Sequence, residues 1–263
     1  MHLHTLNSRR SFELHTREAA DNLIPFIEQA ICLPEGSRVL EIGCGEGGVL
    51  KAFISKRHRA VGVELDREKV FAGCRLMQRE VVEGSMRFIA ENISNISDTL
   101  FDGRFHLIIL NADSRSHSDG AALLYRLRRL LQPNGAVLFR FSPWQTGLDN
   151  HTLEQHSRLA RTVPFLYAMP APIRSFICST LPAEGRSSTL TIERFQSILR
   201  RSDYTLIRRQ LFLSSPSGSG GATSKKRLLP SPLQYLPVVR NLVTSTAYYL
   251  VRPRKEECFY SLS

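Results

Sequence analysis

The sequence predicts an α/β fold built on a mostly parallel sheet, and three observations predict it. Residues 39–42 form a short apolar run that meets a glycine-rich turn, and a helical pattern begins at Val49. This is the order of strand, loop and helix in a βαβ unit. A second apolar run, residues 60–63, follows that helix. Residues 105–110, FHLIIL, form an apolar run interrupted only by His106, as expected for a central parallel strand that is buried on both faces.

The turn itself indicates a ligand. Gly43, Gly45 and Gly47 follow a G-x-G-x-G spacing, and residues without a Cβ let the backbone approach a ligand closely. Glu64 follows the first of these glycines by 21 residues, where an acid at the end of the next strand can accept hydrogen bonds from ribose hydroxyls. Glu41 precedes the turn by two residues. A carboxylate there is poorly suited to a pyrophosphate and well suited to an ammonium group.

Residues 41–47, EIGCGEG, resemble the first motif of class I S-adenosylmethionine-dependent methyltransferases, and VGVELD around Glu64 resembles their ribose-binding segment. Residues 130–141, LLQPNGAVLFRF, resemble the helix, turn and strand that follow the cofactor site in this family. The resemblance implies a Rossmann-like fold with helices on both faces of a seven-stranded, mostly parallel sheet of order 3-2-1-4-5-7-6. It also implies S-adenosyl-L-methionine as cofactor and S-adenosyl-L-homocysteine as product.

The resemblance places the cofactor-binding residues at successive strand ends. In the family, an acid in the position of Glu91 accepts a hydrogen bond from the adenine amino group, and the backbone amide of the next residue, Asn92, contacts a ring nitrogen. The alternative for Glu91 is an exposed loop acid. Asn111 ends the fourth predicted strand and faces the methyl donor. The predicted cofactor-binding set is Glu41, Gly43, Cys44, Gly45, Gly47, Glu64, Leu65, Glu91, Asn92 and Asn111.

A helix with one apolar face is predicted for residues 12–31, ended by residues 34–36, PEG. In the family such a leading helix covers the cofactor pocket, so this segment is either a lid or only a packing element. We expect the last strand to be antiparallel, between the fifth and sixth strands. The other predicted elements are a helix at 66–82 capped by Asp66, a strand at 86–90, a helix at 121–131, a turn at 133–135 before a strand at 136–141, a helix at 191–201, a strand at 204–213, a helix at 233–242 and a strand at 246–251.

Two parts are distinguished: residues 1–36 as an N-terminal helical segment and residues 37–263 as the methyltransferase domain. Residues 142–189 are an aromatic-rich and proline-rich insertion after the fifth strand, at the edge where the methyl donor is expected. We interpret the insertion as a substrate lid, the alternative being a cap that only packs. It resembles a bacterial, type 11-like branch of the family often associated with surface-polysaccharide gene sets. Residues 214–227 are predicted to be a flexible loop.

The candidate catalytic residues are histidines that could act as a general base toward a hydroxyl acceptor. His151 lies in the insertion beside Asp149, and His117 matches a histidine of the small-molecule branch. Ordinary surface histidines would look the same. Residues 111–114, NADS, lack the N/D-P-P-aromatic tetrad used on planar amino groups, and no Pro-Cys pair or metal cluster is evident. The absence of these motifs favours a hydroxyl of a small molecule or glycan as the methyl acceptor, and a site without a metal.

Composition limits the other function classes. The net charge of +11 indicates either a solvated basic surface or an anionic partner, so an RNA methyltransferase is an alternative, although the basic clusters are short. A cofactor-binding protein without catalysis is a further alternative. The five cysteines form no CxxC pair, which argues against a disulfide framework or a zinc site. Without a membrane-span-length apolar run or a signal peptide pattern, a cytoplasmic location is predicted. The sequence leaves the oligomeric state open.

Overall fold

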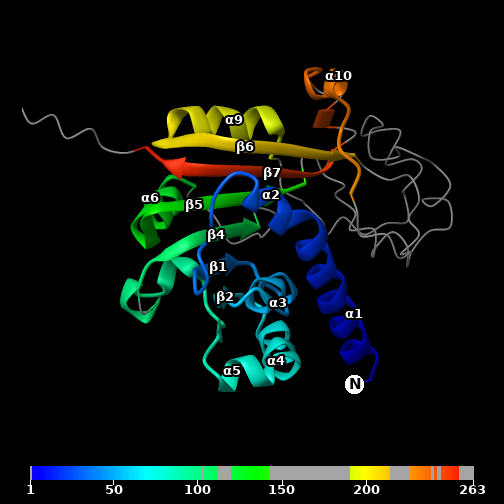
Figure 1. Ribbon diagram of the computed structural model, residues 1–263, viewed down its shortest axis with the longest axis vertical. Helices are drawn as coiled ribbons and strands as arrows, with labels where there is room; N and C mark the ends of the chain where they lie inside the picture. Colours follow the sequence, from blue (N-terminus) through cyan, green and yellow to red (C-terminus); the bar gives the residue numbers. More distant parts are fainter. Residues whose placement is uncertain are drawn as a thin grey trace, which may run out of the picture.

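The computed structural model describes residues 2–101, 103–111, 120–142, 190–213, 226–237, 240–241 and 244–254. Within them, a seven-stranded sheet has the order β3-β2-β1-β4-β5-β7-β6 (Figure 1). The strands from β1 to β5 pair in parallel, whereas β7 is antiparallel to both β5 and β6. The predicted order and the antiparallel last strand are confirmed. The strands are β1 Arg38–Ile42, β2 Arg59–Val63, β3 Met86–Ile89, β4 Phe105–Asn111, β5 Leu131–Phe141, β6 Tyr204–Leu213 and β7 Thr244–Pro253.

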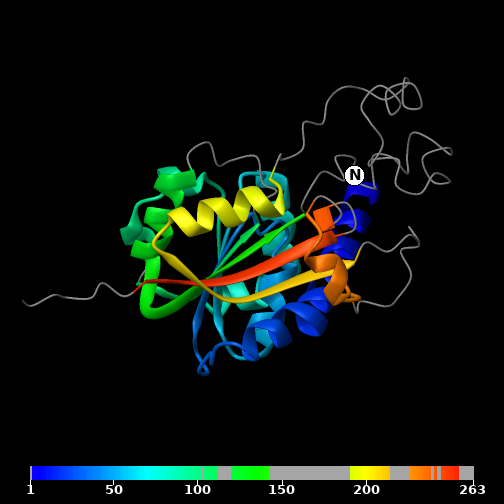
Figure 2. The ribbon, with the colours of Figure 1, turned by 90° about the horizontal axis from the view of Figure 1, so that it is seen from above.

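Helices cover both faces of the sheet. In β4, the buried side chains of Leu107 and Ile109 face one layer, and those of Ile108 and Leu110 face the other. This double burial explains the continuous apolar run that predicted a central strand. Figure 2 shows the two layers on opposite sides of the sheet. One layer holds α1 His2–Glu18, α2 Ile24–Glu28 and α3 Gly48–Ser55, and the other holds α6 Gly120–Leu130 and α9 Ile192–Arg201.

The N-terminal helix differs from its prediction at both ends. Helix begins at His2, and α1 is joined to α2 by a π-helical segment, Ala19–Leu23, so that the helical stretch ends at Glu28. The prediction of residues 12–31 missed the first turns because their composition has no apolar face. α1 as a whole packs against α3, and Arg9, in the missed part, forms an ion pair with Glu13 one turn later at 3.1 Å. Figure 1 shows α1 extending past α3.

The helix predicted for residues 66–82 is two helices, α4 Arg67–Leu76 and α5 Gln78–Val82. The break falls at Met77, whose side chain is fully buried and whose backbone leaves the helical region with φ −118° and ψ 33°. The predicted cap is confirmed, because Asp66 Oδ1 accepts a hydrogen bond from Glu68 N at 3.0 Å. Two short 3-10 helices, Ile93–Asn95 and Asp98–Phe101, lead from β3 to β4.

The ends of β5, α10 and β7 also differ from the predicted ones. β5 begins at Leu131, which pairs with Phe105, and the register then shifts before Ala136, so the expected turn at 133–135 is an irregularity inside this strand. Helix α10, Ser231–Gln234, starts earlier and is shorter than predicted, and β7 is longer at both ends. The bounds of β6 match the prediction, and α9 is capped by Thr191, whose side chain accepts a hydrogen bond from Arg194 N. Among the described residues, no helix is long and apolar enough to cross a membrane.

Candidate functional site

The turn between β1 and α3 is shaped by glycines with left-handed backbone angles. Gly43, Gly45 and Gly47 have φ values of 76°, 54° and 84°, which residues with a Cβ rarely adopt. Gly43 N donates to Val63 O at 2.8 Å, which joins the turn to the end of β2. A Cβ at Gly47 would lie 2.7 Å from Phe88 Cζ. The turn therefore needs glycines at this spacing.

Cys44 lies within this turn but is buried against the sheet. A Cβ built at Gly62 of β2 would lie 2.6 Å from Cys44 Sγ, so the thiol occupies the space that the glycine leaves. Burial raises the pKa of the Cys44 thiol above its usual value, and a neutral thiol is a poor nucleophile. This arrangement assigns the Cys44 side chain to packing and leaves only its backbone available to a ligand.

Glu41 is a buried carboxylate with one unpartnered oxygen. The residue is 1% exposed. Its Oε1 accepts a hydrogen bond from Asn111 Nδ2 at 2.9 Å, whereas Oε2 has no partner among the described residues. Burial raises the pKa of Glu41 to about 7, although the Arg140 charge and the Asn111 hydrogen bond act in the opposite direction. A buried acceptor without a donor is unfavourable, so this position suits a ligand that brings a cationic donor.

Glu64 is placed directly against the glycine turn. Its Oε2 accepts a hydrogen bond from Gly45 N at 2.9 Å, and its Oε1 accepts from Leu65 N and Asp66 N at 2.8 and 3.1 Å. The carboxylate thus bridges the turn and the start of the loop after β2. The Leu65 side chain is 50% exposed at this edge. The acid that the sequence places 21 residues after Gly43 thus contacts the same turn directly, at Gly45.

Glu91 and Asn92 form a compact turn after β3. Ile89, at the end of β3, is the register partner of Val63 at the end of β2, so the turn follows the strand end beside Glu64. Glu91 is exposed, and its Oε1 accepts from Asn92 N at 2.8 Å. That backbone hydrogen bond is the main reason why the pKa of Glu91 is lowered. The N–H that the resemblance assigns to an adenine nitrogen therefore donates to Glu91 in this structure.

Asn111 connects three strands at their carboxyl ends. Its Nδ2 donates to Glu41 Oε1 at 2.9 Å and to Gly43 O at 2.8 Å, and its Oδ1 accepts from Arg140 Nε at 2.8 Å. The sequence predicted that Asn111 faces the methyl donor. The geometry shows a side chain that orients Glu41 and the first glycine of the turn.

A charged cluster next to this site was not predicted. Glu18 at the end of α1 accepts from Lys226 Nζ at 2.6 Å and from Tyr248 Oη at 3.3 Å, and Arg140 Nη1 lies 3.9 Å away. Burial opposes ionisation of Glu18, yet the Lys226 and Arg140 charges lower its pKa to about 2. His15, one turn earlier on α1, has a pKa lowered by burial and by the Arg140 charge.

One sequence signal could have indicated part of this cluster. Arg140 is the only charged residue in the apolar run AVLFRF, and a cation on a buried strand requires a partner. No comparable signal marks Glu18, which lies in a polar stretch of α1. Lys226 was assigned to a flexible loop at 214–227, but its ammonium is paired and Arg227 O accepts from Leu213 N at 2.8 Å.

Other predicted features lie outside the described residues. These are His117, His151 and the insertion at 142–189 apart from its first residue, as well as positions 214–225 of the predicted loop. His106 is described. Its Nδ1 accepts a hydrogen bond from Arg38 N at 3.1 Å, so this side chain links β4 to the start of β1.

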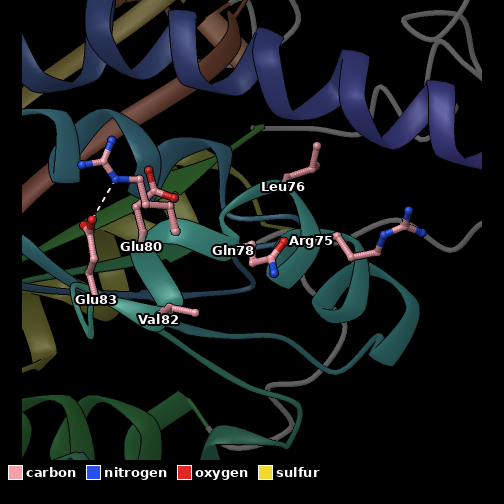
Figure 3. Close-up of a pocket in the computed structure, with 7 residues that line it drawn as sticks. Arg75, Leu76, Gln78, Glu80, Val82 and Glu83 are labelled. Carbon is pink, nitrogen blue, oxygen red and sulfur yellow. Dashed lines mark hydrogen bonds and ion pairs between the residues drawn. The ribbon is translucent and has the colours of Figure 1, made fainter.

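A hollow of about 580 Å³ lies at the bend between α4 and α5 (Figure 3). None of the residues that line it belongs to the glycine turn or to the carboxyl end of a strand. Its wall includes the exposed ion pair of Arg79 and Glu83 at 2.7 Å. In parallel sheets, ligands bind at the carboxyl ends of the strands, and we therefore assign the functional site to the glycine turn and not to this hollow.

A model of the methyltransferase domain family matches residues 12–208. The chain belongs to the methyltransferase domain family. This membership confirms the predicted resemblance to class I S-adenosylmethionine-dependent methyltransferases. The association with surface-polysaccharide gene sets stays a prediction.

Two curated relatives match about half of this methyltransferase. The putative methyltransferase YqeM of Bacillus subtilis is 27% identical over 132 residues, which are 48% of this chain and 50% of that protein. The bifunctional methionine biosynthesis protein MetXA/MetW of Rhodopirellula baltica is 29% identical over 126 residues, 46% of this chain and 20% of that protein. The match thus spans half or less of these relatives' length.

Solved structures show the same fold over nearly the whole chain. The magnesium protoporphyrin IX methyltransferase of Synechocystis has a TM-score of 0.53 at 13% identity, with 92% of this chain and 84% of that chain covered. The glycopeptide N-methyltransferase MtfA has a TM-score of 0.53 at 15% identity, with 91% and 90% covered. At identities this low, the similarity shows the fold alone.

Proposed function

We propose that this methyltransferase transfers the methyl group of S-adenosylmethionine to a hydroxyl group of a small molecule or glycan. The observation that carries the cofactor assignment is Glu41 Oε2, a buried carboxylate oxygen without a partner among the described residues, next to the glycine turn. An ammonium group such as that of the cofactor's amino acid part would supply the missing donor.

The residues at the other strand ends fit the rest of the cofactor. A carboxylate has about four acceptor positions, and Glu64 uses three of them for backbone N–H groups, so it can still accept from a ribose hydroxyl. We propose that Glu91 and Asn92, after β3, contact the adenine. The backbone at Gly43, Gly45 and Gly47 allows close approach. Two structures of similar fold, those of the glycopeptide and magnesium protoporphyrin IX enzymes, contain S-adenosylmethionine and S-adenosylhomocysteine, respectively.

When bound, the cofactor supplies a methyl group on a sulfonium, whose leaving group is a neutral thioether. The chain contributes by orienting the acceptor in line with the methyl group and by excluding water. Asn111 holds in place the carboxylate of Glu41, which is the proposed partner of the cofactor's ammonium group. We propose His151, or else His117, as the base that accepts the proton of the acceptor hydroxyl.

The acceptor class rests on the sequence after β4 and on the nature of similar proteins. The NADS segment lacks the tetrad that would hold a planar amino group. Among the proteins of similar fold, one is a glycopeptide N-methyltransferase and one a magnesium protoporphyrin IX methyltransferase. Neither name describes a nucleic-acid acceptor, which agrees with the small-molecule or glycan acceptor of the proposal.

An RNA acceptor is the second candidate, because the net charge is +11. Part of that charge is compensated locally. Arg126 and Arg129 of α6 pair with Asp98 at 3.4 and 3.0 Å, and Arg128 pairs with Asp203 at 3.7 Å. Exposed pairs contribute little to stability, but they reduce the field that would attract phosphates. Micromolar RNA binding at physiological salt that falls steeply above it would favour the second candidate.

Incubation with methyl-labelled S-adenosylmethionine and a fractionated extract tests the proposal. We expect label in a low-molecular-weight or glycan fraction, and label in RNA would contradict it. His151→Ala should then reduce turnover on the purified acceptor while cofactor binding stays unchanged. Binding of the cofactor without methylation of any fraction would instead support a non-catalytic role.

A further inference from the structure

Four polar side chains from neighbouring strands lie side by side under the N-terminal helix. They are Glu41 on β1, Asn111 on β4, Arg140 on β5 and Tyr248 on β7, and we call them the polar row. Asn111 and Arg140 are register partners, and so are Arg140 and Tyr248. Since side chains alternate along a strand, all four belong to the sheet face covered by α1, α2 and α3.

The inner part of the polar row controls the orientation of Asn111. An arginine side chain can only donate hydrogen bonds, so Arg140 Nε, at 2.8 Å, requires the oxygen of the Asn111 amide. The amide nitrogen must then point the other way, toward Glu41 Oε1 at 2.9 Å. A carboxylate accepts these bonds best when it is ionised. Through one amide, Arg140 therefore favours the ionised, correctly turned Glu41.

The outer part of the polar row is tied to α1. Glu18 lies 3.9 Å from Arg140 and 2.6 Å from Lys226, and these three side chains are only 17 to 24% exposed. The π-helical segment that follows Glu18 also contacts Lys226. Asn22 Oδ1 in this segment accepts a hydrogen bond from the backbone N–H of Lys226 at 3.1 Å. Charges with so little solvent need partners, so Glu18 and Lys226 restrict the position of the Arg140 guanidinium.

The charges around Glu41 make Arg140 its main compensating cation. Arg140 from β5 and the Asn111 amide from β4 favour the carboxylate, while burial, Glu64 after β2 and Glu18 on α1 disfavour it. Loss of Arg140 would leave the neighbouring acids uncompensated. The pKa of Glu41, already about 7, would rise further.

We propose that Arg140 is a positioning residue of the cofactor site: it orients Asn111 and thereby holds Glu41 for the ammonium group of the cofactor, while Glu18 of the N-terminal helix holds Arg140 in place. This inference rests on the proposed function, since it assumes that Glu41 binds that ammonium group. Through Arg140 and Asn111, the end of α1 then influences the position of Glu41, although α1 itself does not contact the ligand.

Calorimetric titration of the full chain with S-adenosylhomocysteine at pH 7 and pH 8.5 tests the inference. A rise of one unit from a pKa of about 7 lowers the carboxylate fraction of Glu41 at pH 7 from about one half to about one tenth, so we expect Arg140→Gln to weaken binding about fivefold at pH 7 and clearly less at pH 8.5. The ligand's own amino group titrates equally with every variant and cancels in the comparison. Arg140→Lys keeps the positive charge but lacks the planar guanidinium with its several N–H donors, so it should recover only part of the affinity.

Arg129→Gln is the matched control, because this arginine is 61% exposed and pairs with Asp98 away from the site; its affinity should equal that of the wild type. Unchanged binding in Arg140→Gln, or an equal loss at both pH values, would overturn the inference and leave the proposed function intact. If Arg140→Gln does not fold, unchanged affinity in Arg140→Lys at pH 7 is the overturning result. Absence of binding by the wild type would overturn the proposed function itself.

Discussion

Replacement of Glu64 by alanine separates two roles of one carboxylate. In the structure it accepts three backbone hydrogen bonds, from Gly45 at 2.9 Å, Leu65 at 2.8 Å and Asp66 at 3.1 Å. The proposed cofactor adds a ribose hydroxyl to these partners. Glu64→Ala therefore removes a stabilising link between β2 and the glycine turn, and it also removes a ligand contact.

The size of each effect follows from the setting. Loss of a hydrogen bond to a charged group costs about 1.5–3 kcal/mol when the partner is left buried, and part of this site is solvated. We expect S-adenosylhomocysteine affinity to fall by about 1–3 kcal/mol, which is roughly 5- to 150-fold. The free energy of unfolding should fall by about 1 kcal/mol, because the backbone N–H groups released here can bond to water.

Calorimetry measures the affinity, and urea unfolding measures the stability. Asp66→Ala is a matched control, since Asp66 is a carboxylate two residues away that caps α4 without contacting the glycine turn. Loss of such a cap costs about 1 kcal/mol, so the control should resemble Glu64→Ala in stability and the wild type in affinity. Glu64→Ala affinity within twofold of the wild type, or an equal loss of affinity in Asp66→Ala, would refute the ribose assignment.

Three further outcomes are expected. Gly62→Ala should lower the free energy of unfolding by about 1–3 kcal/mol in urea titrations, because its Cβ would lie 2.6 Å from Cys44 Sγ; an unchanged midpoint would show that the thiol moves aside. The pKa of Glu41 is raised from 4.5 to about 7, so its contribution to stability is complete below pH 4.5 and is lost as the pH rises through 7, by up to about 3 kcal/mol. Glu41→Gln should therefore lose less stability than the wild type between pH 5 and pH 8, and equal losses would contradict this. Burial raises the pKa of Glu18, but the Lys226 and Arg140 charges together outweigh it and lower the pKa to about 2. The contribution of Glu18 to stability is therefore present above pH 4.5 and is lost toward pH 2; acid unfolding followed by circular dichroism should be shallower for Glu18→Gln, and identical curves would contradict it.

Local pattern was sufficient for the order of the elements. The apolar run of β4 and the glycine turn after β1 each report burial or backbone geometry that depends on neighbours in the chain. For the same reason the cap at Asp66 and the bounds of β6 were predictable. The break at Met77 was not predictable, because the helical pattern continues through this residue, whose side chain is fully buried and whose backbone leaves the helical region.

The residues of the candidate site also separate into those that the sequence predicted and those that only the structure revealed. By itself, the sequence determined the glycine turn and the acids at the strand ends, because these lie in short motifs with a fixed spacing. Those motifs carried the resemblance to the methyltransferase family, and the resemblance supplied the strand order. Only the tertiary structure decided that Asn111 orients Glu41, that Glu64 holds the glycine turn, and that Glu18, Arg140 and Lys226 meet beside them. Residues 18, 140 and 226 come from distant parts of the chain, and charge pairing between them depends on how α1 packs on the sheet, which no local pattern encodes.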